Sequence, residues 1–281
     1  RSARSASTGL IGLVINDLRN PFFTEFATSM QMALAEQGYA TVIGNSDEDP
    51  HRQAQLVQSM IEHGVAGLVI SPTFGDPGAV MDQIAAAQIP AMQVLRKLDG
   101  SQGRIPFSSF DYTAGGAAAT RHLLEQGATR IAFLGGRPDR QITAERTSGY
   151  LAEMAAAGLE PLVLSGPITR HGGHEAAASL PTETQAVLCF NDLVALGLMN
   201  GLARQGRPVG RDLRLVGFDN IEECAEVWPA LSSVSCDIAR FGHDTAGRLL
   251  NWLNSGVVPL DETRAPVGLI ARASSLGAEN G

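Results

Sequence analysis

Lysine is almost absent from this 281-residue sequence, since Lys97 is the only one among 21 basic side chains. There is no Gly-Lys-Ser/Thr stretch to hold a nucleotide phosphate, so nucleotide hydrolysis has no visible machinery. No apolar run approaches the roughly 20 residues that cross a bilayer, and we expect no membrane partner. The three cysteines form no Cys-x-x-Cys pair and are odd in number, which favours a reducing, cytoplasmic compartment.

Recognisable catalytic and metal motifs are missing as well. His171, His174 and Glu175 have the order His-x-x-His-Glu, which matches neither zinc-protease spacing, and the two glycines between the histidines indicate a loop or a helix start. No Gly-x-Ser-x-Gly elbow is present, and no acid, base or nucleophile set can be assembled. We therefore expect a protein that is not an enzyme and that uses neither a metal nor a cofactor.

The composition is that of a globular protein with an acidic balance. Hydrophobic residues make up 44% and charged residues 18% of the chain, and the formal net charge of −8 repels phosphate backbones. The chain begins at Arg1 with neither an initiator Met nor an apolar signal core, and this beginning looks like the trimmed end of something longer. Nucleic-acid binding is thus expected only from a part outside this sequence.

Short apolar runs alternate with helical segments along the chain. Nearly all of these runs are continuously apolar, as in strands covered by helices on both faces, so the alternation predicts an α/β fold of two doubly wound parallel sheets. A boundary near Asp111 separates the two sets, and a helix at 237–253 precedes a last strand that can return to either sheet. The expected strands are 10–15, 41–43, 67–70, 91–95, 107–110, 131–134, 161–164, 186–190, 213–217, 231–234 and 266–270.

Polar residues follow many of these strands. Open α/β sheets bind their ligands at the carboxyl ends of the strands. We therefore expect one ligand cleft between the two sheets, lined by the polar strand ends: Asn16, Asp17, Ser71, Arg96, Asp111, Asn191, Asp192, Asp219 and Asn220.

The loop after the first strand combines polar and aromatic residues. Asn20 is a good helix-capping residue, and Pro21 fits the first helical turn, where its missing N–H costs nothing. Phe22 and Phe23 are adjacent on the helix and do not share a face. Either both are ordinary core residues, or one of them points toward the cleft.

Several polar residues of the second half have two interpretations. Asp192 opens an apolar helix and is most simply its N-cap, which leaves Asn191 freer to face a ligand. Asp219 precedes no strongly helical run, so capping explains it less well, and Arg146 is either a solvated helix residue or a ligand contact. Arg with Asp or Asn hydrogen-bonds vicinal hydroxyls in pairs, while an aromatic ring covers the C–H side of a sugar. Together with Arg96 and the two phenylalanines, these residues favour sugar binding.

The order and spacing of several segments resemble the effector-binding domain of the LacI/GalR transcriptional repressors, over nearly the whole chain. That domain is similar in turn to periplasmic ribose-type binding proteins. The segments are TGLIGLV at 8–14 after a Ser-Ala-Arg-Ser linker, NPFF at 20–23, NSDEDP at 45–50, FDYTAGG at 110–116, RIAFLGG at 130–136, ERTSGY at 145–150, FNDLVALG at 190–197 and VGFDN at 216–220.

This resemblance implies the periplasmic binding protein-like I fold, with two Rossmann-like subdomains, three crossovers and a ligand in the cleft between them. It implies a remnant of a hinge linker at 1–7, an N-terminal subdomain of 8–110 plus 237–267, and a C-terminal subdomain of 111–236 plus 268–281. The sugar contacts of the family fall on seven residues, with Asp17 as a weaker candidate: Asn20, Phe22, Phe23, Arg96, Arg146, Asn191 and Asp219.

Two residues depart from the pattern of the family. Many relatives carry an acidic residue where this chain has Leu95, and many place a polar Gln where it has Cys236. Both changes remove hydrogen-bonding capacity. The resemblance therefore implies a ligand that is less hydroxyl-rich than ribose, or differently oriented.

The function implied by the resemblance is that of an effector-sensing domain of a repressor, whose sugar-like effector modulates DNA binding. Operator DNA would be contacted by an N-terminal helix-turn-helix headpiece that is absent here. A homodimer is implied because half-site recognition needs two headpieces, with contacts on the N-terminal subdomain and around Val227-Trp228-Pro229. The alternative is a periplasmic sugar-binding protein of an ABC transporter, which has the same fold and cleft.

Overall fold

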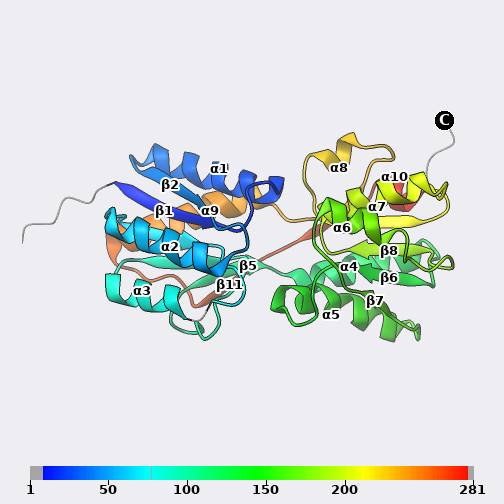
Figure 1. Cartoon of the computed structure of the whole chain (residues 1–281), viewed down its shortest axis with the longest axis horizontal. Coiled ribbons are helices and arrows are strands. Elements are labelled where there is room, and N and C mark those ends of the chain that lie inside the picture. The colour runs from blue at the N-terminus through cyan, green and yellow to red at the C-terminus, as the bar shows by residue number, and fades with distance from the viewer. Residues whose placement is uncertain (1–8, 77, 278–281) are drawn as a thin grey trace, which may run out of the picture. The chain divides into compact units, whose positions relative to one another are not determined.

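The computed structural model describes residues 9–76 and 78–277, and the predicted linker remnant at 1–7 lies outside the described residues. The chain divides into two units (Figure 1). The first unit contains the residues up to Phe110 together with Asp237–Ala265, and the second contains Asp111–Cys236 together with the residues from Pro266 onward. The last change of unit follows Ala265, whereas the sequence predicts it after Val267.

The first unit is built on a parallel sheet of six strands. The strand order is β11-β5-β4-β3-β1-β2, and every neighbouring pair is parallel. All six carboxyl ends therefore lie at the same edge of the sheet. The strands are β1 (Leu10–Ile15), β2 (Ala40–Asn45), β3 (Gly67–Ile70), β4 (Ala91–Val94), β5 (Phe107–Phe110) and β11 (Glu262–Ala265).

Side-chain caps start the first two helices of the first unit a few residues after the strand ends. Asn20 Oδ1 accepts a hydrogen bond of 3.1 Å from the Phe22 amide, and Pro21 opens the helix, so the predicted cap is confirmed. Asp49 repeats this arrangement before Pro50, accepting from the His51 amide at 2.8 Å. The helices are α1 (Pro21–Glu36), α2 (Pro50–Glu62), α3 (Ala79–Ala87) and α9 (Ile238–Ser255).

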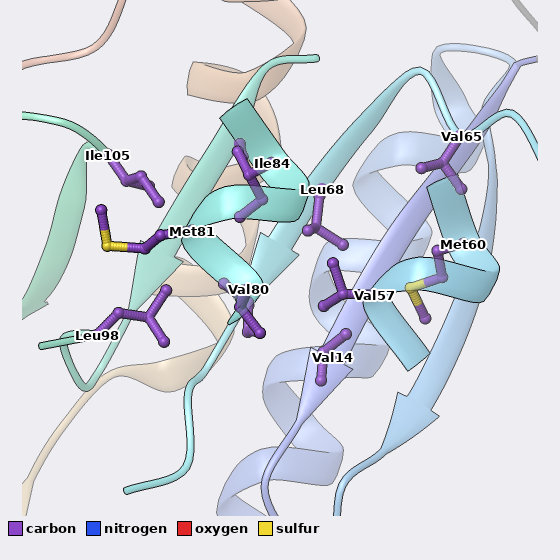
Figure 2. Close-up of a cluster of buried hydrophobic side chains, with 12 residues drawn as sticks. Val14, Val57, Met60, Val65, Leu68, Val80, Met81, Ile84, Leu98 and Ile105 are labelled. Carbon is purple, nitrogen blue, oxygen red and sulfur yellow. The ribbon is translucent and has the colours of Figure 1, made fainter. Parts of the chain in front are cut away.

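Both faces of this sheet are covered, as its continuously apolar strands predict. Figure 2 shows the layer under α2 and α3, in which Val14 and Leu68 of the strands meet Val57 and Val80 of the helices. Helices α1 and α9 pack against each other. Their contact includes the rings of Phe26 and Phe241, whose centroids are 5.8 Å apart. Helices on both faces leave the strand ends as the place for polar side chains.

Strand β11 is missing from the sequence-based prediction. Its residues, Glu-Thr-Arg-Ala, carry no apolar run because the strand lies at the sheet edge, where only β5 pairs with it. Lys97 contacts both strands at this edge. Its Nζ is 2.7 Å from Glu262 Oε2 on β11 and 4.7 Å from the centre of the Phe107 ring on β5. The ion pair lowers the pKa of Glu262.

The second unit contains another sheet of six strands, in the order β12-β10-β9-β8-β6-β7. All neighbours are parallel except β12, which runs antiparallel to β10. The strands are β6 (Ile131–Leu134), β7 (Leu162–Leu164), β8 (Ala186–Cys189), β9 (Arg214–Asp219), β10 (Ser232–Ser235) and β12 (Gly268–Ile270).

Glycines bring two pairs of helices of the second unit into backbone contact. A Cβ atom built on Gly116 of α4 would lie 2.2 Å from Arg146 O, and one on Gly149 of α5 would lie 2.1 Å from Thr113 O. Helices α6 and α7 are in similar contact.

Within the described residues, no helix is both long and apolar enough to cross a membrane. The helices are α4 (Tyr112–Glu125), α5 (Gln141–Ala156), α6 (Arg170–Ala176), α7 (Asp192–Arg204), α8 (Glu223–Glu226) and α10 (Ala273–Leu276).

A buried histidine joins α4 to α10. His122 Nε2 lies 2.7 Å from Ser275 Oγ on α10, which in turn lies 2.6 Å from Ser232 Oγ on β10. Burial lowers the pKa of His122. The charge of Glu125 acts in the opposite direction, and that of Arg214 adds to the lowering.

This histidine is expected to make stability fall in mild acid. Its pKa in the folded protein lies below the unfolded value of 6.5, so the unfolded chain binds the proton first as the pH drops. The contribution is complete above pH 6.5 and is lost as the pH falls through the lower folded value, by at most about 1.4 kcal/mol per pH unit. Urea unfolding at pH 7.5, 6.5 and 5.5 should show a smaller decline for His122→Gln than for the wild type. Equal declines would contradict the expectation, and His171→Gln, at an exposed position on α6, is the control.

Candidate functional site

In the first unit, the loops at the carboxyl edge of the sheet are hydrogen-bonded to one another. Asn16 Nδ2, after β1, donates to Pro72 O at 3.0 Å, and the Ser71 hydroxyl donates to Asn16 Oδ1. The Leu18 amide donates to Asn45 Oδ1 at 3.2 Å. The loops that follow β1, β2 and β3 therefore form one layer. We call the five predicted site residues at this edge of the sheet the first cluster: Asp17, Asn20, Phe22, Phe23 and Arg96.

The two phenylalanines of this cluster are both buried. Phe22 is 3% and Phe23 8% exposed. The Phe22 ring lies 6.4 Å from the Phe110 ring and 5.7 Å from the Phe23 ring, which it meets edge to face. Phe22 thus belongs to the aromatic core, and the Phe23 ring packs against it. Asn20 uses its side-chain oxygen for the helix cap.

Asp17 is tied to a neighbour on the surface. Its Oδ1 accepts from the Arg19 amide at 3.0 Å and from Arg19 Nε at 2.8 Å. Arg19 also pairs with Asp47 in the loop after β2. Asp17 therefore helps to join the first two loops of the layer.

Arg96 is a buried cation with a carboxylate partner from another strand end. Its side chain is 5% exposed, its Nη1 lies 2.8 Å from Glu48 Oε2, and its guanidinium stacks 5.0 Å from the Phe74 ring centre. Leu95 is buried, with a left-handed φ of 66°. The carboxylate beside Arg96 thus comes from Glu48, 48 positions away in the chain. The sequence did not predict this partner. The one local signal for Glu48 is that it follows the end of a strand.

In the second unit, Arg146 lies in an aromatic cage, and the reading of it as a solvated helix residue is wrong. It is 3% exposed, and its guanidinium carbon lies 4.4, 4.2 and 4.6 Å from the ring centres of Tyr112, Phe190 and Phe218. Its Nη2 is 3.4 Å from Asp219 Oδ1, whereas its buried Nε has no hydrogen-bond partner among the described residues. We call Arg146, Asn191 and Asp219 the second cluster.

Asp219 ends β9 with a strained backbone and an unusual charge balance. Its φ is 107°, in the region that side chains other than glycine avoid, and the residue is 5% exposed. Burial raises the pKa of Asp219, the charge of Arg146 lowers it, and the carboxylate of Asp192 raises it further. A neutral carboxyl can both donate and accept a hydrogen bond, so this group suits a hydroxyl partner.

The predicted N-cap of α7, Asp192, is wrong, because Asn191 occupies that position. Asn191 is the N-cap of α7, with its Oδ1 accepting from the Val194 amide at 2.9 Å and its Nδ2 donating to Ile168 O at 3.3 Å. Asp192 is already inside the helix and turns its carboxylate away from the cap, toward β10. Asn191 has the extended backbone of an N-cap residue. The sequence-based prediction placed this cap one position too late.

The cysteines and histidines of the chain form no inorganic site within the described residues. Cys189, Cys224 and Cys236 are free and buried. Burial raises the pKa of Cys236 well above its usual value, and the charge of Asp219 acts in the same direction. In residues 9–76 and 78–277, no three His, Cys, Asp or Glu side chains are placed to hold a metal ion.

Comparison with known proteins decides the family. Residues 120–275 match the periplasmic binding protein-like domain. The chain is 30% identical to the HTH-type transcriptional regulator reg1 of Streptomyces lividans, over 98% of this chain and 83% of that protein. The chain belongs to the LacI/GalR family of transcriptional regulators.

Further LacI/GalR members agree in sequence and in fold. The ribose operon repressor of Bacillus subtilis (strain 168) is 27% identical, over 98% of this chain and 83% of its own length. A LacI family transcriptional regulator from Enterococcus faecalis V583, crystallised with bound ribose, is 25% identical and superposes with a TM-score of 0.85, over 96% of this chain and 100% of that one. The relatives are regulators of transcription, and the two α/β sheets have the periplasmic binding protein-like fold that the sequence predicts.

Proposed function

We propose that this chain is the effector-sensing domain of a LacI-type repressor, and that a sugar or sugar derivative bound by the second cluster modulates DNA binding. The observation that carries the proposal is Arg146. A guanidinium enclosed by three aromatic rings, with a carboxyl at 3.4 Å and a buried N–H left without a partner, is incomplete as a structural element. A ligand oxygen at Nε would complete it.

The chemistry of both clusters suits a polyhydroxylated ligand. Arg146 and Asp219 offer a fixed donor beside a carboxyl, which is the pairing that holds vicinal hydroxyls. Arg96 pairs with Glu48, and Phe23, which at 8% is the more exposed of the two phenylalanines, is the ring that we propose to cover the C–H side of the ligand. The ribose in the Enterococcus faecalis regulator is a ligand of the same class.

The partners of the proposed regulator follow from its family. We propose that operator DNA is bound through an N-terminal helix-turn-helix headpiece, and that the protein acts in the cytoplasm. The net charge of −8 supports DNA binding through a separate headpiece, because such a chain has little affinity for phosphate backbones by itself.

A ligand screen tests the function directly. D-ribose, D-galactose, D-xylulose, maltose and cellobiose, with their phosphates and the related polyols, are added to the purified chain, and the melting temperature is measured. At least one should stabilise the folded state, because saturation at 100 times Kd contributes about 2.7 kcal/mol. If no member of the panel raises the melting temperature and isothermal titration detects no binding, the sugar proposal is wrong.

We further propose that the chain forms a homodimer through the face of the second unit around Trp228. Trp228 is 89% exposed, and with Val227 and Pro229 it borders a mostly apolar hollow of about 570 Å³ along α7. Its α7 wall is formed by Leu196, Met199, Asn200 and Ala203. An exposed indole beside such a hollow is typical of a protein interface.

Trp228→Glu is expected to shift this chain from dimer to monomer, because it places a charge in the apolar contact. Light scattering coupled to size exclusion, over a range of protein concentrations, should show at least about a tenfold weaker dimer. Leu151→Glu, at a 40% exposed position on α5, serves as the matched control and should leave the assembly unchanged. A Trp228→Glu protein that dimerises like the wild type would contradict the proposed interface.

A further inference from the structure

Asp192 is a buried carboxylate that serves a segment other than its own helix. It is 1% exposed, its Oδ1 accepts from Ser233 Oγ at 2.6 Å, and its Oδ2 accepts from the Ile221 amide at 2.9 Å. The thiol of Cys224 is a third hydrogen-bonding neighbour. Ser233 belongs to β10, Ile221 to the turn that follows β9, and Cys224 to α8.

The turn held by Asp192 begins at Asp219. Asp219 and Asn220 have φ angles of 107° and 58°, both in the left-handed region. Two consecutive residues of this kind persist only where surrounding bonds hold them. Ser233 Oγ accepts from the Asn220 amide at 3.0 Å while it donates to Asp192, so the carboxylate fixes both amides after Asp219, one directly and one through the serine.

Gly217 shows how closely β9 is fitted to this carboxylate. A Cβ atom at this position of the strand would lie 2.1 Å from Asp192 Oδ1. Any side chain at this position would displace the carboxylate. The glycine therefore leaves the space that the Asp192 side chain occupies beside the turn. Two cations lie near this turn: Arg146 Nη2 is 3.4 Å from Asp219 Oδ1, and Arg272 Nη2 donates to Asn220 Oδ1 at 2.9 Å.

We infer that Asp192 is a positioning residue for effector recognition, which holds the turn after β9 so that the Asp219 carboxyl stays beside Arg146. This inference rests on the proposed function, in which Asp219 contacts the effector. Asp192 itself is buried and acts through Asp219. It also acts electrostatically, because a second carboxylate disfavours the ionised form of Asp219.

The first experiment needs no effector. Carboxyl carbon NMR follows the titration of Asp219 in the wild type and in Asp192→Asn. Asparagine keeps an acceptor for the Ile221 amide and can donate to Ser233 Oγ, but it removes the charge. The pKa of Asp219 should fall in the variant. An unchanged Asp219 titration would overturn the electrostatic half of the inference, whatever the effector proves to be.

The second experiment measures binding, with the sugar from the screen that stabilises the wild type most. Asp192→Asn should weaken binding at least tenfold at pH 7 and move the pH at which affinity changes to lower values, which general loosening would not do. Ser233→Ala, which breaks the link to the Asn220 amide, should weaken binding, and it keeps the inference testable if Asp192→Asn does not fold. Asp139→Asn, at a 54% exposed side chain of the same unit, is the control. Unchanged affinity in folded Asp192→Asn and Ser233→Ala would overturn the positioning role. Absence of binding by the wild type would instead remove the proposed function and leave the NMR result standing.

Discussion

Replacing Arg146 with methionine is expected to weaken effector binding by at least about 100-fold while the protein stays folded. The loss follows because hydrogen bonds to a charged group contribute about 1.5 to 3 kcal/mol each, and Arg146 can offer more than one to a sugar. Methionine keeps an apolar chain among the rings of Tyr112, Phe190 and Phe218. Isothermal titration with the most stabilising sugar of the panel measures the effect.

Folding should survive this change because Asp219 can become neutral. Removing one partner of a buried ion pair costs about 3 to 5 kcal/mol when the other charge remains. Burial already raises the pKa of Asp219, and without Arg146 it rises further, so the carboxyl takes up a proton and no bare charge remains. Arg137→Met, at a 66% exposed side chain of the same unit, should bind like the wild type. Wild-type affinity in Arg146→Met would remove Arg146 from the site.

Replacing Gly197 with alanine is expected to destabilise the protein by at least about 3 kcal/mol, although alanine is the better helix former. The added Cβ would lie 1.9 Å from Arg170 O, and a Cβ on the facing Gly173 would lie 2.0 Å from Val194 O. Both obstacles are backbone atoms, so α6 and α7 would have to separate. Urea unfolding followed by circular dichroism gives the free energy of unfolding.

Gly247→Ala is the matched control for this prediction. Gly247 lies in α9, and no heavy atom beyond its own neighbourhood comes within 4 Å of a Cβ built there. The same substitution should therefore stabilise the protein by about 0.5 to 1 kcal/mol, through propensity alone. If both variants shift stability by the same amount, the close approach of α6 and α7 does not have the energetic weight that we assign to it.

Local signals in the sequence predicted most of the fold. Continuously apolar runs marked the buried strands, because helices cover both faces of each sheet. The Asn20-Pro21 pair marked the start of α1, because capping depends on residues one to three positions apart. Strand β11 escaped prediction because an edge strand with one partner needs no apolar run. The cap of α7 was misplaced by one residue, since Asn191 and Asp192 are both good capping types and only the tertiary bonds of Asp192 distinguish them.

The candidate site was predictable in outline and not in its pairings. Polar strand ends indicated which residues to consider, because parallel strands bring their carboxyl ends to one edge. The pairing of Arg96 with Glu48, and the cage of Arg146 formed by three rings from three separate segments, join residues far apart in the chain. No periodicity or spacing encodes such contacts. The function of Asp192 through the turn after β9 was invisible for the same reason.

The ion pair between Lys97 and Glu262 gives this protein a built-in chemical reporter. Lys97 carries the only lysine amine of the chain, and its side chain is 18% exposed while it is held by the first residue of β11. An amine-selective acylating reagent can modify this side chain only when the ammonium leaves Glu262 and loses its proton. The rate of labelling at Lys97, read by peptide mass spectrometry, therefore reports how often this ion pair opens at the strand from which the chain passes back into the second unit.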